Sequence, residues 1–279
     1  MKEFLKPEVR SDLRFLYENG FGRFLLKIAT RPWVSKIAGK YLDSRLSRRL
    51  IPGFIEKNHI LAHEAEEREY RSFNDYFTRT LKPGLRPFSE EADDFTSPAD
   101  SLLSVYPIEK DSVFSIKNSR YTVSSLLRDE ELAARFEGGW CCIFRLTVSD
   151  YHRYSYFDSG VQQKNVRLKG KLHTVNPIAE EHYRIYAENA REYAVIETEN
   201  FGVAVQMEVG ALLVGRIVNH KTKGEVRRGE EKGCFQYGGS TVIVLLQKDT
   251  AVFDADLLEA SRKGLEWKVK LGQTVGRKK

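Results

Sequence analysis

Three short polar segments of this chain contain the side chains that nucleophilic or acid–base chemistry requires. The segment with a nucleophile is Tyr237-Gly238-Gly239-Ser240-Thr241, in which a serine follows two glycines and precedes an apolar run. Glycine reaches backbone angles that are closed to other residues, so the Ser240 hydroxyl could approach a neighbouring carbonyl. A glycine pair before a serine is more often a simple turn into a core strand, so this segment predicts no activity by itself.

The other two segments contribute an imidazole and a carboxylate. His152 lies inside Ser149-Asp150-Tyr151-His152-Arg153-Tyr154, and Asp100 ends Ser97-Pro98-Ala99-Asp100. Histidine titrates near physiological pH and can serve as a general base, although a hydrogen-bonded structural histidine is the more common case. A carboxylate, an imidazole and a hydroxyl that are distant in sequence can form a triad. Spacing alone does not bring Asp100, His152 and Ser240 together.

Strand-length apolar segments make up the chain from about Asp94 onward, and they would have to position these groups. They favour β-branched residues and alternate with turns rich in Gly, Pro, Asn and Asp. The segments are Leu102 to Ile108, Trp140 to Val148, Val203 to Val209, Leu212 to Val218 and Thr241 to Leu246. A minor helix is expected over Val123 to Phe136. The pattern predicts an α+β fold in which N-terminal amphipathic helices precede a mainly antiparallel β catalytic domain, residues 73–279.

The first 72 residues are predicted to form a helical region with one apolar face. Trp33, Ile37 and Tyr41 recur every four positions along that face. Basic residues occupy other positions: Lys36, Lys40, Arg45, Arg48 and Arg49. Aromatic side chains on one side and cations on another are typical of a helix that lies in a membrane interface. An ordinary amphipathic helix packed on the domain has the same pattern, so both interpretations stay open.

A second helical stretch is expected between this region and the strands, over His59 to Arg79. Its charged run, Glu64 to Glu69, indicates a solvent-exposed face. The following Leu81-Lys82-Pro83-Gly84 ends the helix, because proline and glycine interrupt regular structure.

The composition excludes several classes of protein but does not identify one. The 279 residues, 41% of them hydrophobic, suffice for a large core without disulfides. The three cysteines are too few and wrongly spaced for a zinc site, so no zinc is expected. The net charge of +6 favours an anionic partner. No standard nucleic-acid-binding motif is present, so we do not expect the protein to bind nucleic acid. The start lacks the apolar core of a signal peptide, and no long apolar run predicts a membrane-spanning helix.

The chain resembles the phosphatidylserine decarboxylase proenzymes, from about Phe73 to its end, and most of all their clostridial-type branch. The resemblance rests on six blocks that stand in the family's order. They are Phe73-Asn74-Asp75-Tyr76-Phe77-Thr78-Arg79 with Leu81-Lys82-Pro83-Gly84-Leu85-Arg86-Pro87, Ser97-Pro98-Ala99-Asp100, Asp150-Tyr151-His152-Arg153, Thr174-Val175-Asn176-Pro177, Glu208-Val209-Gly210-Ala211 with Val214-Gly215, and Gly229-Glu230 with Gly233-Cys234-Phe235 and Gly238-Gly239-Ser240-Thr241-Val242. Several ordered blocks are far more specific than any one of them.

Two positions depart from the family's pattern. Ser101 stands where the family usually has glycine, and Ser155 stands where many members carry a second histidine. The local second imidazole is therefore missing. His152 could serve both self-cleavage and decarboxylation, or His173 could approach from elsewhere, and both hypotheses stay open.

The resemblance implies a self-processing enzyme. The Ser240 hydroxyl would attack the Gly239 carbonyl, with His152 as base and Asp100 orienting the imidazole. The chain would separate after residue 239 into a β chain, 1–239, and an α chain, 240–279. Ser240 would become a covalent pyruvoyl cofactor, which acts as an electron sink during decarboxylation of phosphatidylserine to phosphatidylethanolamine.

The same resemblance implies the partners and the location. The substrate would lie in an anionic membrane, the β and α chains would form a heterodimer, and a higher homo-oligomer is conceivable. We expect a peripheral protein on the cytoplasmic side of the cell membrane, with residues 1–72 as its membrane-associating region. The alternative is a lipid-surface binding relative that kept the fold and lost processing, which Ser101 and Ser155 would favour.

Overall fold

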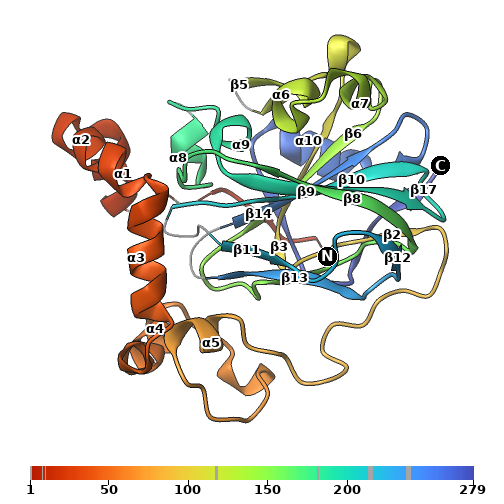
Figure 1. The fold of residues 1–279 in the computed structure, drawn as a ribbon. Helices are drawn as coiled ribbons and strands as arrows, with labels where there is room; N and C mark the ends of the chain where they lie inside the picture. Colours follow the sequence, from red (N-terminus) through yellow and green to blue (C-terminus); the bar gives the residue numbers. More distant parts are fainter. Residues whose placement is uncertain are drawn as a thin grey trace.

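The core of the protein is a nine-stranded antiparallel sheet (Figure 1). The computed structural model describes residues 2–7, 9, 11–116, 119–180, 182–212, 216–236 and 240–279. In spatial order the strands are β1 (Phe4–Leu5), β16 (Glu266–Val269), β3 (Ser101–Pro107), β6 (Trp140–Leu146), β14 (Ser240–Leu246), β10 (Val203–Val209), β9 (Arg191–Thr198), β8 (Gly160–Leu168) and β12 (Gly224–Val226). β14 lies between β6 and β10 and is buried along its whole length. A continuous apolar run suits such a strand, because both of its faces are covered.

Three smaller sheets accompany the main one. The first contains β11 (Arg216–Asn219), β13 (Glu231–Gln236) and β7 (Arg153–Ser155), and the second contains β15 (Ala251–Val252), β17 (Thr274–Lys278) and β2 (Asp94–Thr96). The third is the hairpin of β4 (Val113–Ile116) and β5 (Ser119–Thr122). Side chains alternate between the two faces of β14. Val242 and Val244 belong to a core with Phe235 of β13, whereas Ile243 and Leu245 belong to a second core on the other face.

Helices cover both cores. The second core, on the face away from β13, is closed by α6 (Val123–Leu127), α7 (Glu130–Ala134), α8 (Pro177–Glu180) and α9 (Ile185–Glu188). On the other face, α10 (Ala255–Arg262) inserts Leu257 into the first core. A single 3-10 turn, η3 (Lys110–Ser112), precedes β4.

A column of helices stands along one side of the sheets (Figure 1). Its members are α1 (Ser11–Glu18), α2 (Gly20–Ala29), α3 (Pro32–Leu42), the 3-10 helix η1 (Arg45–Leu50), α4 (Ile51–Lys57), the 3-10 turn η2 (Ala62–Glu64) and α5 (Phe73–Phe77). Buried Tyr17 anchors α1 to the β-rich part, where its hydroxyl accepts a hydrogen bond from the Thr174 amide at 3.0 Å. At the other end, Leu42, Phe73 and Phe77 form a small core of their own. Within the described residues, no helix has the length and apolar character needed to cross a membrane.

The predicted fold class is confirmed, and four of the five predicted strands coincide with β3, β6, β10 and β14. Of the fifth, Leu212 to Val218, residues 213–215 lie outside the described part, and β11 begins only at Arg216. The minor helix divides into α6 and α7, because Arg128 adopts a left-handed conformation with φ 52°.

The helix expected over His59 to Arg79 is wrong. Only η2 and α5 are helical there, and the segment between them folds back so that Ala65 bridges Leu81. The charged run has no apolar face to bury, so packing gives it no reason to continue as a helix. The apolar residues are instead concentrated in α5.

Candidate active site

Ser240 is the first residue of the central strand β14. It is opposite Leu146 of β6 and has no exposed surface. Among the described residues its Oγ has no hydrogen-bond partner, and the same is true of the Thr241 hydroxyl. The neighbouring Gly239, the predicted cleavage residue, lies outside the described part together with 237 and 238. A buried hydroxyl without a partner is costly, so its retention at this position points to a role in chemistry.

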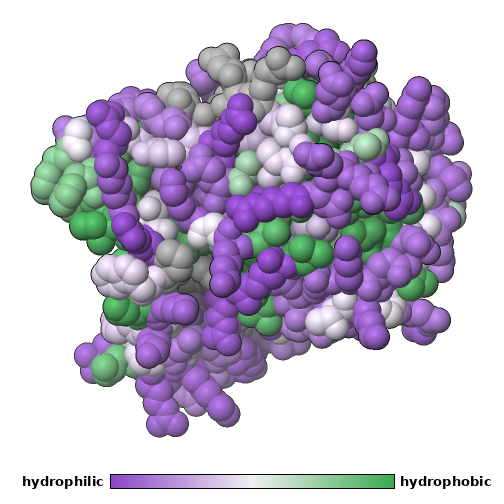
Figure 2. All heavy atoms as spheres, turned by 45° about the horizontal axis from the view of Figure 1, so that its top comes forward, coloured by the Kyte–Doolittle hydropathy of each residue, from purple (hydrophilic) through white to green (hydrophobic). Residues whose placement is uncertain are grey.

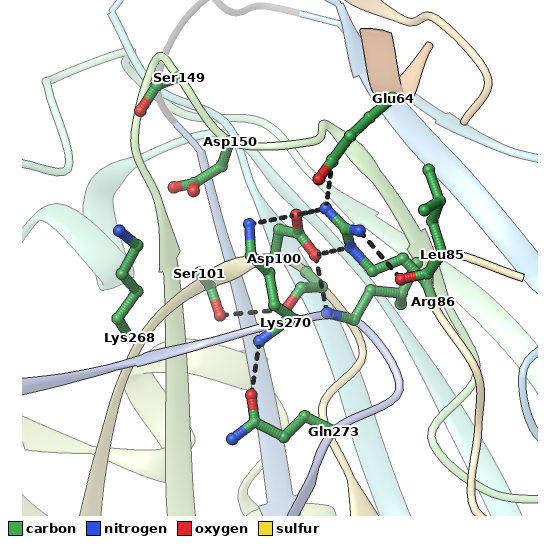
Figure 3. A network of polar contacts seen from close by, with 12 residues as sticks. Glu64, Leu85, Arg86, Asp100, Ser101, Ser149, Asp150, Lys268, Lys270 and Gln273 are labelled. Carbon is green, nitrogen blue, oxygen red and sulfur yellow. Dashed lines mark hydrogen bonds and ion pairs between the residues drawn. The ribbon is translucent and has the colours of Figure 1, made fainter. Parts of the chain in front are cut away.

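Asp100 occupies the turn before β3 and is almost fully buried, with 2% of its surface exposed. Figure 3 shows its carboxylate clamped by Arg86, whose Nε and Nη2 donate to the two oxygens at 2.8 and 2.7 Å. Nζ of Lys270 lies 3.3 Å from Oδ2, and the Leu271 amide donates to Oδ1 at 2.8 Å. Burial alone would raise the pKa of Asp100, but the Arg86 and Lys270 charges outweigh it and lower the pKa. Asp100 is therefore held as a carboxylate.

His152 is completely buried in the loop that leads into β7. Its Nδ1 lies 2.8 Å from the carbonyl oxygen of Asp150, and its ring lies 4.1 Å, centre to centre, from that of Phe77 in α5. A carbonyl can only accept a hydrogen bond, so Nδ1 carries the hydrogen and Nε2 is the basic nitrogen. The fold thus fixes both the orientation and the tautomer of the predicted base.

The structure does not join Asp100 to His152. Within the described residues, every hydrogen bond and ion pair of Asp100 goes to Arg86, Lys270 or Leu271. The group that orients the imidazole is instead the main chain of Asp150. The predicted role of Asp100 as the orienting carboxylate therefore stays a prediction, as do the roles of His152 and Ser240.

Asp150 is a further candidate that the sequence reasoning did not single out. It follows β6, whose last residue faces Ser240, and its Oδ2 accepts hydrogen bonds from the Thr147 amide at 2.6 Å and hydroxyl at 2.8 Å. Figure 3 shows it close to the Asp100 cluster. Burial raises the pKa of Asp150 to about 6, with a smaller contribution from the Asp100 charge, against the Thr147 hydrogen bonds. Its place beside His152 in the motif was the only sequence signal.

Both positions that depart from the family's pattern flank the Asp100 turn. The Ser155 amide donates to the Pro98 carbonyl at 3.0 Å, and the Ser101 hydroxyl donates to the Ala99 carbonyl at 3.3 Å. Both serines are buried. The main chain of Ser155 is therefore bonded to the segment that carries Asp100.

His173, the other predicted imidazole, lies on the opposite face of the sheet. It is buried, its ring stacks on Tyr183 at 4.1 Å between ring centres, and Tyr17 lies 3.4 Å from its Nδ1. Burial lowers its pKa to about 4, so the imidazole is neutral. Nδ2 of Asn189 donates to the carbonyls of His173 and Gly210, and Gly210 directly follows the residue that pairs with Thr241. Among the residues that the structure describes, His173 is thus connected to the site through Asn189 and Gly210.

Comparison with known proteins gives the family. A model of the phosphatidylserine decarboxylase family matches residues 73–277. The chain belongs to the phosphatidylserine decarboxylase family. This result confirms the predicted enzyme class, a carboxy-lyase of the phosphatidylserine decarboxylase type.

Curated relatives extend the similarity to nearly the whole chain. The phosphatidylserine decarboxylase proenzyme 2 of Clostridium acetobutylicum is 47% identical over 97% of this chain and 93% of its own length. The phosphatidylserine decarboxylase proenzymes of Ruminiclostridium cellulolyticum and Clostridium botulinum are 38% and 37% identical, over 95% and 99% of this chain and 90% and 96% of their own lengths. The predicted clostridial-type branch is therefore confirmed, and the similarity includes the N-terminal helices.

Proposed function

We propose that this chain is a proenzyme that cuts itself between Gly239 and Ser240 and then decarboxylates phosphatidylserine through the pyruvoyl group left at position 240. Family membership supports the substrate, and the relatives' names describe proenzymes. The observation that carries the proposal is the Ser240 hydroxyl at the first residue of the central strand, which is buried and has no partner among the described residues. This position fits a pyruvoyl group, because the new chain end would be held by a strand with neighbours on both sides.

The proposed cleavage requires no outside reactant until its last step. The Ser240 oxygen bonds to the Gly239 carbonyl carbon, the bond from that carbon to the Ser240 nitrogen breaks, and the nitrogen takes up a proton. Loss of the α-hydrogen and of the Gly239 carboxylate then leaves a dehydroalanine, which water converts to pyruvoyl and ammonia. The attack is intramolecular, so burial of Ser240 does not prevent it.

His152 is the proposed base. Its Nδ1 is held by the Asp150 carbonyl, so Nε2 is the nitrogen that can take the hydroxyl proton. Asp100 remains ionised beside Arg86, and its negative charge would stabilise an imidazolium in this buried region without touching it. In the mature enzyme the pyruvoyl group would supply an electron sink, and His152 would return a proton to the substrate.

The two proposed products would remain one molecule. The α chain, residues 240–279, would contribute β14, which pairs with β6 and β10, and β16, which pairs with β3. These strands are mostly buried. Extraction of the α chain would expose both cores, which roughly 25 cal/mol per Å² of apolar surface makes very unfavourable.

We further propose that the helical column docks the enzyme on an anionic phospholipid bilayer at the cytoplasmic side of the cell membrane. Large apolar side chains of α2 and α3 are exposed, among them Phe21 (64%), Trp33 (55%) and Ile37 (61%). Figure 2 shows hydrophobic surface at the edge of the molecule where these helices stand. Exposed clusters of this kind mark surfaces that bind a partner.

The charges of the same segment favour an anionic membrane as that partner. Between residues 19 and 50 of the sequence, Asp43 is the one acidic residue. The basic residues of this stretch are Arg23, Lys27, Arg31, Lys36, Lys40, Arg45, Arg48 and Arg49. All of these basic residues are exposed. Cations near an anionic leaflet contribute about 1 kcal/mol each, and the apolar side chains add insertion into the interface.

Intact-mass measurement of the purified protein tests the central proposal. We expect two chains that divide at Gly239–Ser240, with the smaller one carrying the mass change from an amino-terminal serine to a pyruvoyl group. A single chain of unchanged mass would overturn the proposal and would favour the lipid-binding relative that has lost processing.

A further inference from the structure

Arg79 is a buried cation that has no anionic partner among the described residues. It is 4% exposed, and its buried Nε has no hydrogen-bond partner in the described part of the chain. The contact that it does make is with the face of the Tyr76 ring, 5.3 Å from the guanidinium carbon. A cation over a ring does not replace the hydrogen bond that the buried Nε–H group lacks.

The other lysine and arginine side chains that are buried in the described part each make at least two hydrogen bonds. Arg145 pairs with Glu266, Lys232 pairs with Glu208 at 2.6 Å, and Arg191 donates to four main-chain carbonyls. Arg79 is therefore an exception within this fold. Burial lowers its pKa, whereas the phenols of Tyr76, Tyr151 and Tyr70 and the Asp100 charge raise it, which shows how little compensation the charge receives.

Three carboxylates in the neighbourhood of Arg79 are already bonded to other cations. Asp100 and Glu64 are both bound by Arg86, and Lys270 also lies on Asp100. Asp75, in the same segment as Arg79, is held by Arg68 through two hydrogen bonds. These three carboxylates are thus bonded to other cations, and an external anion would supply Arg79 with a partner.

The main chain of Arg79 lies next to the segment that carries His152. The main-chain carbonyls of Thr78 and Arg79 accept hydrogen bonds from Nε of Arg153, at 2.8 and 3.3 Å, and Arg153 directly follows His152. Two residues earlier, the Phe77 ring lies against that of His152. Phe77 packs on Leu42 at the end of α3, so the segment connects the exposed helices to the site.

We propose that Arg79 binds the phosphodiester of the phospholipid headgroup. This inference rests on the proposed decarboxylation of phosphatidylserine, whose headgroup has two anions. A cation on the departing carboxylate would stabilise the ground state more than the transition state, in which that charge disperses, and would slow the reaction. The phosphodiester keeps its charge throughout, and its two oxygens match the planar fork of a guanidinium.

The test compares Arg79→Gln and Arg79→Lys with wild type and with Arg71→Gln, which removes an exposed cation from the same segment. Intact mass first establishes that each variant is processed, because processing needs no headgroup. On mixed micelles containing phosphatidylserine, we expect KM for Arg79→Gln to rise about 10- to 100-fold while kcat changes less than about threefold. Arg79→Lys should lie in between, and Arg71→Gln should match wild type.

Two further measurements separate a ligand-binding role from a structural one. Removal of a buried, unpaired charge should raise the melting temperature of Arg79→Gln, whereas removal of a structural contact would lower it. Glycerophosphoethanolamine should inhibit wild type more strongly than ethanolamine does, and the variant should lose this preference. Inhibition by inorganic phosphate as strong as that by glycerophosphoethanolamine would instead assign a free-phosphate site.

Processed Arg79→Gln with an unchanged KM would overturn the inference, and so would a raised kcat, which would assign the carboxylate to Arg79. If both Arg79 variants remain unprocessed, glycerophosphoethanolamine and ethanolamine are compared by inhibition of wild type alone, and equal inhibition would refute the phosphodiester site. A wild-type protein that runs as one uncut chain would refute the proposed function itself, which is a distinguishable outcome.

Discussion

The helical column and the β-rich part depart from ordinary burial in opposite directions. In α2 and α3, side chains as large as Phe21 and Trp33 are exposed. Around β14, by contrast, Glu208 and Lys232 have no exposed surface and pair with each other at 2.6 Å. Exposed apolar groups and buried charges both cost free energy in an isolated folded chain.

The two regions differ in what offsets these free-energy costs. The buried charges of the β-rich part are mostly satisfied internally, as the Glu208–Lys232 pair and the clamp on Asp100 show. The exposed side chains of the helices have no such partner in the described part of the molecule, so their compensation has to come from outside. The β-rich part is therefore self-contained, whereas the helical column is suited to contact with an external surface.

The largest expected effect is on chemistry in the self-contained region. Ser240→Ala removes the only atom that can attack the Gly239 carbonyl in the proposed mechanism. We expect an uncut chain by intact mass and no measurable release of CO₂ from phosphatidylserine. Far-ultraviolet circular dichroism should stay unchanged, because alanine fits the same strand position. A Ser240→Ala protein that still separates into two chains would disprove the assignment of the cleaved bond.

The second effect concerns the buried ion pair of Glu208 and Lys232. In the uncut Ser240→Ala background, Lys232→Met should lower the free energy of unfolding by about 3–5 kcal/mol, because it leaves the Glu208 charge buried without its cation. Urea denaturation measures this change. The double variant Glu208→Leu/Lys232→Met should recover most of the loss. A loss below about 1 kcal/mol for Lys232→Met would show that the pair is not what holds this region together.

The third effect tests the outward-facing region. Trp33→Ser/Ile37→Ser should weaken flotation with phosphatidylserine-containing liposomes about tenfold or more, because each buried apolar side chain contributes roughly 1.5–3 kcal/mol. The matched control is Val161→Ser/Val252→Ser, which removes exposed apolar groups, both 43% exposed, from the β-rich part. Equal losses in both pairs would mean that general hydrophobicity, and not the helical face, determines binding.

The smallest effect is a pH dependence inside the self-contained region. The pKa of Asp150 is raised from 3.8 to about 6 by burial, so the folded state holds its proton more tightly than the unfolded state does. The stability from this group is complete below about pH 4 and is lost as pH rises through 6. As the pH rises from about 4 to about 6, the free energy of unfolding of Asp150→Asn should therefore increase relative to that of wild type, by at most about 3 kcal/mol. Parallel urea curves at pH 4 and 7 measure it, and a constant difference would contradict the shift.

The sequence predicted the fold better than it predicted the site. The strand runs at Val203–Val209 and Thr241–Leu246 were recognisable because β-branched residues and turns are local signals. Trp33 and Ile37 were recognisable as one helical face, although periodicity alone left open whether that face is buried or exposed. The helix expected over His59 to Arg79 failed because its register had no continuous apolar face to bury.

Within the site, the sequence by itself determined which groups are present, through ordered motifs that carry Asp100, His152 and Ser240. Only the tertiary structure decided which of them touch. Arg86 reaches Asp100 with two parallel hydrogen bonds, and the Asp150 carbonyl takes Nδ1 of His152. A carboxylate selects its partner by geometry and charge among all groups that the fold brings near, and that selection has no local signature in the chain. For the same reason, no local pattern in the sequence marks Arg79, whose buried Nε has no partner in the described part of the fold.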